Sequence, residues 1–126
     1  MENNVLAERI KQNMIRVVID KVISPKGFKK IRANIDSFES PSKLNRKGDD
    51  QFYVPDITGV LNGRKSYFEV AMKTERIRHL ITKWKLLSNM ARFKEGKLFL
   101  LVPKGHLAFT NKIVRDNQIS AEIIKV

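Results

Sequence analysis

The chain has 126 residues, of which 42% are hydrophobic and 30% are charged, and these values predict one globular domain spanning residues 1–126. Lysine and arginine number 25 against 13 acidic residues, and the resulting net charge of +12 predicts a polyanionic partner. With no cysteine and only two histidines, the sequence excludes a disulfide scaffold, a thiolate zinc site and a cysteine nucleophile. Any metal would have to be held mainly by carboxylates, which favours Mg²⁺ or Mn²⁺.

The distribution of basic residues favours some polyanionic partners over others. Nucleic acid is the simplest choice, with DNA ahead of RNA. An anionic membrane comes third, because the basic residues are scattered instead of being packed in one cluster. No apolar run approaches the roughly 20 residues that cross a bilayer, and residues 1–4 lack the charge of a signal peptide, so we expect an intracellular or viral protein in the cytoplasm. The sequence leaves open whether the chain forms a homodimer.

The first 35 residues predict a helix and then a strand. Apolar residues recur at helical spacing between residues 5 and 23, so we expect a well-buried helix there. Its main stripe is Leu6, Ile10, Met14, Val17 and Val18, and Ile15, Ile19 and Val22 widen it. The Ser-Pro-Lys-Gly run at 24–27 ends the helix, and alternation over residues 28–35 predicts a short strand with one apolar face.

The next segment predicts a loop and a β-hairpin. Residues 36–50 contain Ser, Pro, Asn, Gly and charge with little periodicity, which is typical of a long functional or mobile loop. Residues 51–61 and 65–72 are strand-like and flank the Asn62-Gly63 dipeptide, so we expect an antiparallel pair. Pro55 belongs at a strand start or bulge, because it has no N–H to donate.

The remainder of the chain predicts alternating helices and strands. Thr74 is the expected N-cap of a helix that runs to about Phe93. Its apolar face holds Ile77, Leu80, Ile81, Trp84, Leu87 and Ala91, which makes Trp84 a core residue. The continuous apolar run at 98–102 predicts a strand in the middle of the sheet. A helix at 107–116 and a strand at 119–126 complete an α-β-β-β-α-β-α-β order.

Two carboxylates on neighbouring predicted strands suggest a site. Asp56 follows Pro55, and Glu69 lies on the strand after the turn. Because hairpin partners lie about 5 Å apart, the two carboxylates could share one cation. Carboxylates that hold Mg²⁺ and a lysine that stabilises charge are what metal-assisted phosphodiester hydrolysis requires. Simpler interpretations are a turn residue for Asp56 and the solvent side of an alternating strand for Glu69.

These motifs resemble the PD-(D/E)xK nuclease superfamily. The resemblance rests on Pro55-Asp56, on Phe68-Glu69-Val70, and on the long helix and hydrophobic strand that follow. It implies a three-layer α/β core of the restriction-endonuclease-like type, with a small mixed sheet flanked by helices. It also implies that Asp56 and Glu69 bind Mg²⁺ or Mn²⁺ and that a lysine two residues after Glu69 assists the reaction. Ala71 occupies that position, and Lys73, on the same side of an extended strand, is the nearest substitute.

Superfamily members often add an acidic residue from the first helix, and Glu8 is the candidate. Helical spacing places Glu8 inside the apolar stripe, where a carboxylate needs a partner. The alternative is that Glu8 has no metal role and pairs with a nearby base such as Lys11.

Two sets of basic residues are candidates for binding DNA phosphates. One is the polar side of the long helix, with Arg76, Arg78, Lys83 and Lys85, and the other is the loop with Lys43, Arg46 and Lys47. The helix charges could instead form a solvated face, and His79 is expected on the surface. The sequence thus predicts a metal-dependent DNA endonuclease. It leaves open a catalytically degenerate nucleic-acid-binding protein on the same fold, or a basic assembly protein with an acidic protein partner.

Overall fold

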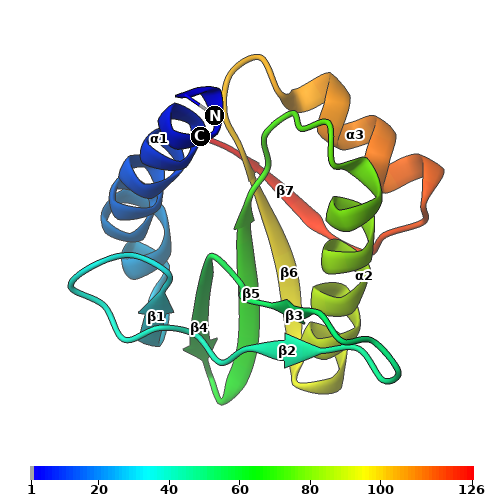
Figure 1. The fold of residues 1–126 in the computed structure, drawn as a ribbon. Helices are drawn as coiled ribbons and strands as arrows, with labels where there is room; N and C mark the ends of the chain where they lie inside the picture. The colour runs from blue at the N-terminus through cyan, green and yellow to red at the C-terminus, as the bar shows by residue number, and fades with distance from the viewer. Residues whose placement is uncertain (1) are drawn as a thin grey trace.

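A computed structural model describes the backbone of residues 2–126 and the side chains of residues 5–126 (Figure 1). The helices are α1 (Glu2–Val18), α2 (Ile77–Phe93) and α3 (Leu107–Asp116), and α1 continues through a π-helical turn, η1 (Ile19–Ile23), and a 3₁₀ turn, η2 (Ser24–Lys26). The strands are β1 (Lys29–Ala33), β2 (Leu44–Asn45), β3 (Phe52–Tyr53), β4 (Ile57–Leu61), β5 (Arg64–Val70), β6 (Glu95–Val102) and β7 (Glu122–Lys125). Within the described range, no helix is long and apolar enough to cross a membrane.

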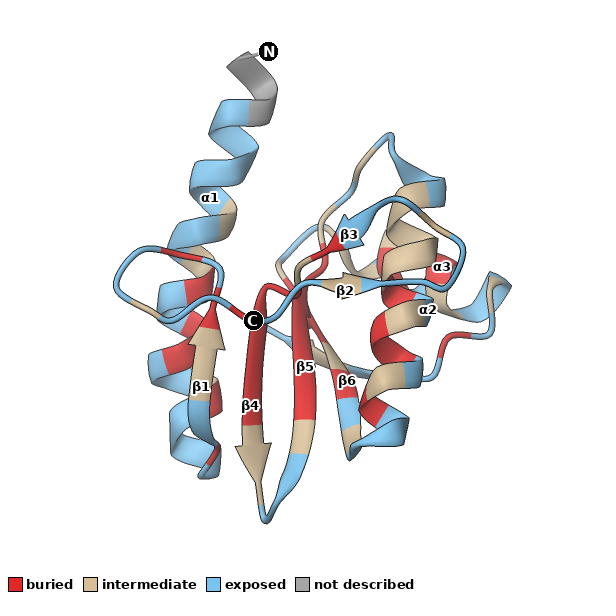
Figure 2. Ribbon diagram, turned by 60° about the horizontal axis from the view of Figure 1, so that its bottom comes forward, coloured by how far each residue is buried: buried red, intermediate tan, exposed pale blue. Residues whose placement is uncertain are grey.

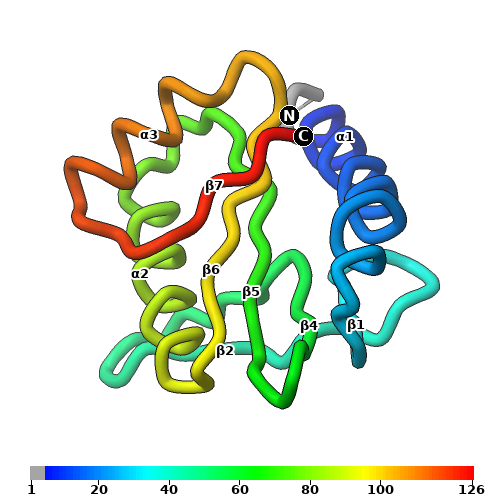
Figure 3. Tube along the Cα trace, turned by 180° about the vertical axis from the view of Figure 1, so that it is seen from behind, coloured from blue at the N-terminus to red at the C-terminus, as the bar shows by residue number. Residues whose placement is uncertain are grey.

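Five of the strands form one mixed sheet in the order β1-β4-β5-β6-β7. β1, β4 and β5 pair antiparallel, whereas β5, β6 and β7 pair parallel. Figure 3 shows β4, β5 and β6 side by side between α1 and α2. The class α/β, the small mixed sheet and the predicted order of helices and strands in it are therefore confirmed. The remaining two strands, β2 and β3, form a separate antiparallel ribbon.

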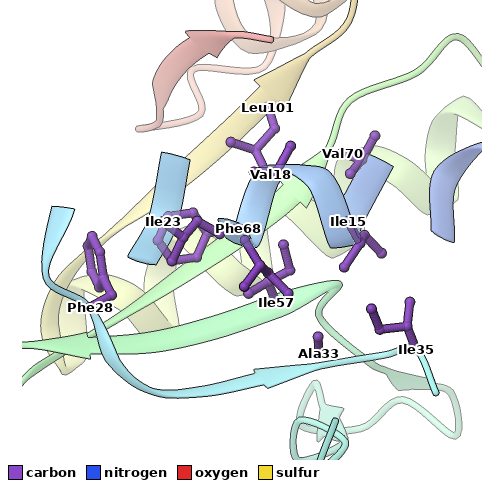
Figure 4. Close-up of a cluster of buried hydrophobic side chains, with 11 residues drawn as sticks. Ile15, Val18, Ile23, Phe28, Ala33, Ile35, Ile57, Phe68, Val70 and Leu101 are labelled. Carbon is purple, nitrogen blue, oxygen red and sulfur yellow. The ribbon is translucent and has the colours of Figure 1, made fainter. Parts of the chain in front are cut away.

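The helices lie on opposite faces of the sheet and bury two cores. On one face, α1 and η1 pack Ile15, Val18 and Ile23 against Ile57 and Phe68 of the central strands (Figure 4). On the other face, α2 and α3 pack against the strand side chains that point away from α1. That second core includes Tyr67, Trp84, Leu87, Leu98, Leu100 and Ile113. The expected core position of Trp84, which is fully buried, is confirmed.

The first helix is buried only in its second half, which corrects the expectation of a well-buried helix. Leu6 and Ile10 are 59% and 42% exposed, while Ile15 is 1% exposed. In Figure 2 the described part of the N-terminal half of α1 extends past the end of the sheet, in the pale blue of exposed residues. Apolar spacing gives the side of the helix that faces the sheet, but it does not tell how far the sheet reaches.

The hairpin forms at Asn62-Gly63 as expected. Both residues have positive φ, 53° and 76°, which is the signature of the type I′ turn that joins right-twisted strands. The single strand expected over residues 51–61 is instead divided into β3 and β4. Pro55 lies in the break, two residues before β4, which suits a residue that cannot donate a ladder hydrogen bond.

The segment between β5 and α2 differs from the prediction. β5 ends at Val70, and α2 begins at Ile77, so residues 71–76 form a connection of irregular backbone. Thr74 is not the N-cap: its Oγ1 accepts a hydrogen bond from the Arg76 N–H at 3.1 Å, and Arg76 is the residue before the helix. The helix end at Phe93 and the bounds of α3 agree with the prediction, and β6 lies inside the sheet between β5 and β7, as expected of a strand covered on both faces.

Candidate functional site

The two predicted carboxylates lie together on adjacent strands. Asp56 immediately precedes β4, and Glu69 is the second-last residue of β5. In the antiparallel β4–β5 register Ile57 is opposite Phe68, which brings Asp56 next to Glu69. Both residues are only 2% exposed. The interpretations of Asp56 as an ordinary turn residue and of Glu69 as a solvent-facing strand residue therefore do not describe their surroundings.

Each carboxylate is fixed by a backbone N–H from the other strand. The Asp56 N–H donates to Glu69 Oε2 at 2.8 Å, and the Val70 N–H donates to Asp56 Oδ2 at 2.9 Å. These reciprocal bonds fix one oxygen of each carboxylate to the backbone where β4 begins and β5 ends. The other two oxygens, Asp56 Oδ1 and Glu69 Oε1, are left for other partners.

Those two oxygens meet two lysines from opposite helices. Lys11 Nζ of α1 lies 2.9 Å from Asp56 Oδ1, and Lys83 Nζ of α2 lies 3.1 Å from Glu69 Oε1. The side chains of Lys11 and Lys83 are 26% and 13% exposed. We call these four residues, Lys11, Asp56, Glu69 and Lys83, the carboxylate–lysine quartet. It balances two buried negative charges with two positive ones, as buried charges require.

The electrostatics of the quartet follow from this burial. Burial raises the pKa of Glu69, the neighbouring charge of Asp56 raises it further, and Lys83 and Lys11 oppose the change. Burial alone would lower the pKa of Lys11, but the charges of Asp56 and Glu69 outweigh it and raise that pKa above its ordinary value. Lys11 therefore remains an ammonium group at neutral pH.

A hollow of about 460 Å³ opens over the quartet, between α1 and the start of α2. Its lining includes Glu69, Lys11 and Lys83 from the quartet, together with four more charged or titratable residues: Glu8, Lys73, Arg76 and His79. We call it the carboxylate hollow. Burial and the charges of Arg76, Lys83 and Lys11 lower the pKa of His79, so its ring is mainly neutral at pH 7. The half-buried His79 is thus part of this wall and not the plain surface residue that was expected.

Lys73 does not occupy the place that the strand argument gave it. β5 ends three residues before it, so Glu69, Ala71 and Lys73 do not continue on one extended face. Lys73 is exposed at the rim of the carboxylate hollow, and its N–H donates to His106 Nδ1 at 2.9 Å. Lys83 holds the position next to Glu69. The alternative interpretation of the helix charges as a solvated face does not describe Lys83, because its ammonium is paired inside the site.

Glu8 is also placed differently from the prediction. It was expected inside the apolar stripe, but it is exposed at the rim of the carboxylate hollow, because the sheet ends before this turn of α1. The ion-pair partner of Lys11 is Asp56 and not Glu8. The signal that identifies Lys11 is its spacing: it lies four residues before Ile15, so it continues the buried stripe of α1 toward the site.

The remaining basic candidates are all exposed, on two elements. Arg76, Arg78 and Lys85 lie at the start of α2 and along it, and Lys43, Arg46 and Lys47 lie in the segment that forms the β2–β3 ribbon. These positions agree with their expected solvent exposure. The packing of the ribbon beside α2 could not be anticipated from the sequence.

The quartet can be tested as a metal site by its chemistry. Among the residues that the structure describes, no group of three or more His, Cys, Asp or Glu side chains gathers. Asp56 and Glu69 nevertheless offer two oxygens of the hard type that Mg²⁺ and Mn²⁺ prefer, and Mg²⁺ commonly retains several waters beside one or two carboxylates. Both oxygens already face a cation, the ammonium group of Lys11 or Lys83. The residues therefore fit a divalent ion, provided that these ammonium groups move aside.

Comparisons with protein-family models, with curated proteins and with solved structures give no match to this chain.

Proposed function

We propose that the protein is a metal-dependent nuclease that hydrolyses phosphodiester bonds of DNA, on a fold of the restriction-endonuclease-like, PD-(D/E)xK type. The observation that carries the proposal is the pairing of Asp56 and Glu69 at the end of two central strands, with the Lys83 ammonium 3.1 Å from Glu69. The order of helices and strands and the net charge of +12 support it.

In this proposal the backbone bonds orient the carboxylates before the reaction. Asp56 Oδ1 and Glu69 Oε1 would hold Mg²⁺ or Mn²⁺, because the second oxygen of each carboxylate is bonded to a backbone N–H group. When bound, the ion supplies Lewis-acid polarisation of a phosphate and a hydroxide at neutral pH. Lys83 would stabilise the negative charge that develops on the phosphate oxygens.

Lys83 takes the role that the resemblance assigns to the residue at position 71. Ala71 is fully buried in the core under α2, so a lysine could not reach the carboxylate hollow from there without leaving that core. Lys83 reaches Glu69 from the facing helix instead. Lys73 and Glu8, at the rim of the hollow, are proposed as contributors that orient substrate or water.

A second candidate is a DNA-binding protein without catalysis on the same fold. It is favoured by the occupation of all four carboxylate oxygens, two by N–H groups and two by ammonium groups. If Lys11 and Lys83 do not release the carboxylates, no metal can bind, and the quartet is a structural ion-pair network.

Plasmid nicking with Mn²⁺ or with EDTA tests the proposal. Asp56→Asn and Glu69→Gln should abolish Mn²⁺-dependent nicking, because each removes a ligand charge, while circular dichroism shows a folded protein. Lys83→Met should lower the rate about 10²- to 10³-fold, the usual cost of removing one group that stabilises the transition state.

The matched control is Lys112→Met. Lys112 is also a helical lysine in an ion pair, with Asp116 at 2.8 Å, but it is exposed on α3 outside the carboxylate hollow, so this change should leave the rate within a few-fold of the parent. Salt-sensitive DNA binding by a parent protein that never nicks DNA would reject the nuclease and establish the second candidate. Nicking by Asp56→Asn at the parent rate would refute the assignment of the site.

A further inference from the structure

A second hollow lies beside the first, between the β2–β3 ribbon and α2. Its volume is about 280 Å³. The ribbon contributes Arg46, Asp49, Gln51 and Tyr53 to its lining, and the start of α2 contributes Arg76, Arg78, His79 and Thr82. We call it the arginine hollow. Its walls come from two segments about 30 residues apart in the chain, and Figure 2 shows the ribbon next to α2.

An aromatic contact joins the ribbon to α2, and hydrogen bonds hold the ribbon segment together. The rings of Tyr53 and His79 lie 5.2 Å apart, tilted by 34°. Tyr53 is 4% exposed, and its hydroxyl lies 3.4 Å from Asp49 Oδ2 and 3.3 Å from Gln51 Oε1, both in the same segment. The Gln51 N–H also donates to Asp49 Oδ1 at 2.9 Å. The arginine hollow therefore has an internally bonded ribbon segment on one side, and its lining includes the buried side chain of Tyr53.

The two hollows adjoin each other, because Arg76 and His79 line both of them. Together they make a trough from α1, over the quartet and the first turn of α2, to the ribbon. Six basic side chains line the trough against three acidic ones. The basic residues are Lys11, Arg46, Lys73, Arg76, Arg78 and Lys83, and the acidic residues are Glu8, Asp49 and Glu69.

The charge in the arginine hollow is only partly neutralised. Arg46 lies 3.7 Å from Asp49 Oδ2, which leaves one anion against three arginines. Arg76 and Arg78 make no ion pair with any residue whose side chain the structure describes, and both are exposed. Exposed guanidinium groups without acidic partners are suited to phosphate, which they can bind through two N–H groups at once.

We propose that the arginine hollow is a phosphate subsite that holds one DNA strand next to the bond that is cleaved over the quartet. The strand lies along the trough, with its backbone against Arg76 and Arg78 and with the ribbon as its outer wall. The inference rests on the proposed function and adds to it a strand path and the residues that bind that path. Of the basic residues expected to bind DNA, Lys43, Lys47 and Lys85 line neither hollow, so the trough assigns them no direct contact.

The test measures binding without cleavage. Fluorescence anisotropy with a single-stranded DNA of about 12 nucleotides, within the usual site size for single strands, is recorded in EDTA over a series of salt concentrations. The variant is Arg76→Ser with Arg78→Ser. Serine is a favoured residue before a helix, so the change at Arg76 should not weaken α2 and a loss of binding would not reflect unfolding. The control is Arg64→Ser with Arg92→Ser, two exposed arginines that line neither hollow.

The Arg76/Arg78 variant should bind at least about tenfold more weakly at low salt, and its log–log salt slope should be shallower by roughly 1.4, or about 0.7 for each lost phosphate contact. The Arg64/Arg92 control should remain within a few-fold of the parent. Equal losses in variant and control, or no loss in the variant, would overturn the subsite. A parent that binds with this dependence but never nicks DNA would reject the nuclease and leave the subsite standing, whereas a parent that binds no DNA at low salt would reject both.

Discussion

The four charged side chains of the quartet are not equivalent. Lys83 is buried more deeply than Lys11, with 13% of its side chain exposed against 26%, and it approaches the carboxylate whose pKa is raised. Lys11 comes from the turn of α1 at which the helix passes beyond the sheet, and it contacts Asp56. Lys11 therefore has more freedom to withdraw than Lys83. In the proposed nuclease, Lys11 is a counter-ion that a metal replaces, and Lys83 shifts from Glu69 Oε1 to the phosphate.

Lys11→Met should therefore weaken the folded state and strengthen metal binding. Removing one member of a buried ion pair leaves the other charge without a partner, and because Lys11 is partly exposed we expect a loss of about 1–3 kcal/mol. The same change removes the cation that competes for Asp56 Oδ1, so Mn²⁺ should bind more tightly and should recover part of the lost stability. Urea unfolding with and without Mn²⁺, and Mn²⁺ binding followed by electron paramagnetic resonance, measure the two effects.

The control for Lys11→Met is Lys21→Met, which removes an exposed lysine from η1 at the other end of the same helical segment. It should change neither quantity. If Lys11→Met loses stability but gains no affinity for Mn²⁺, Lys11 is a structural counter-ion and does not occupy a metal position.

At this scale the sequence predicts which carboxylates meet but not which lysine serves them. Asp56 and Glu69 are set by strand pairing and by the Asn62-Gly63 turn, which are local signals. The choice of Lys83 over Lys73 depends on where β5 ends and on how α2 is placed over the sheet. Those are tertiary facts, and the periodicity of α2 alone assigns Lys83 to the polar side.

The register between β5 and β6 is set by a close backbone contact. An ideal Cβ at Gly96 would lie 1.9 Å from the backbone oxygen of Lys65 and 2.8 Å from Ser66 Oγ. The Ser66 hydroxyl in turn accepts a hydrogen bond from the Lys97 N–H at 3.0 Å. The pairing of β5 with β6 shifts by one residue between Lys65 and Tyr67, which is where this contact occurs. A residue without a side chain is required there.

Gly96→Ala should therefore destabilise the protein by about 1–3 kcal/mol, the usual cost of forcing extra atoms into a packed site, because backbone must move to admit the methyl group. Gly48→Ala is the matched control: its Cβ would meet nothing, and only its φ of +83° opposes the change, so a smaller loss of about 1 kcal/mol is expected. Urea denaturation of both variants gives the comparison. A Gly96 variant as stable as the parent would mean that β6 can shift along β5 without cost.

The elements themselves are largely predictable, but the extents of several of them are not. The bounds of α3 and the interior place of β6 follow from apolar pattern and strand composition. The exposed half of α1 and the β2–β3 ribbon do not, since neither depends on local sequence. α1 loses its cover where the sheet ends, and the ribbon has strands of two residues each, too short for any periodicity.

On the scale of the whole molecule, two cores share one sheet. Phe68 of β5 and Leu101 of β6 point toward α1, while their neighbours Tyr67 and Leu100 point toward α2 and α3. Neither core can unfold without disturbing the strands that also carry the other core. Strand alternation predicts this division. The joining of the two cores into one cooperative unit is a consequence of the three layers.

Ile15→Ala should accordingly destabilise both cores together. Ile15, on the side of α1 that faces the sheet, is 1% exposed, so its truncation should cost about 2–5 kcal/mol. Trp84 is the only tryptophan of the chain and lies in the core on the opposite face, so its fluorescence reports on a layer that Ile15 does not contact. Because the cores share β5 and β6, the fluorescence midpoint in urea should fall together with the far-ultraviolet circular dichroism midpoint. Ile10→Ala, at a 42% exposed position of the same helix, should lower both by much less. The cooperative unit would be refuted if, in the Ile15 variant, the dichroism signal were lost earlier while the Trp84 transition stayed at the parent midpoint. The α1 layer would then unfold by itself, and Lys11 would separate from Asp56 while the α2 side of the site stayed folded.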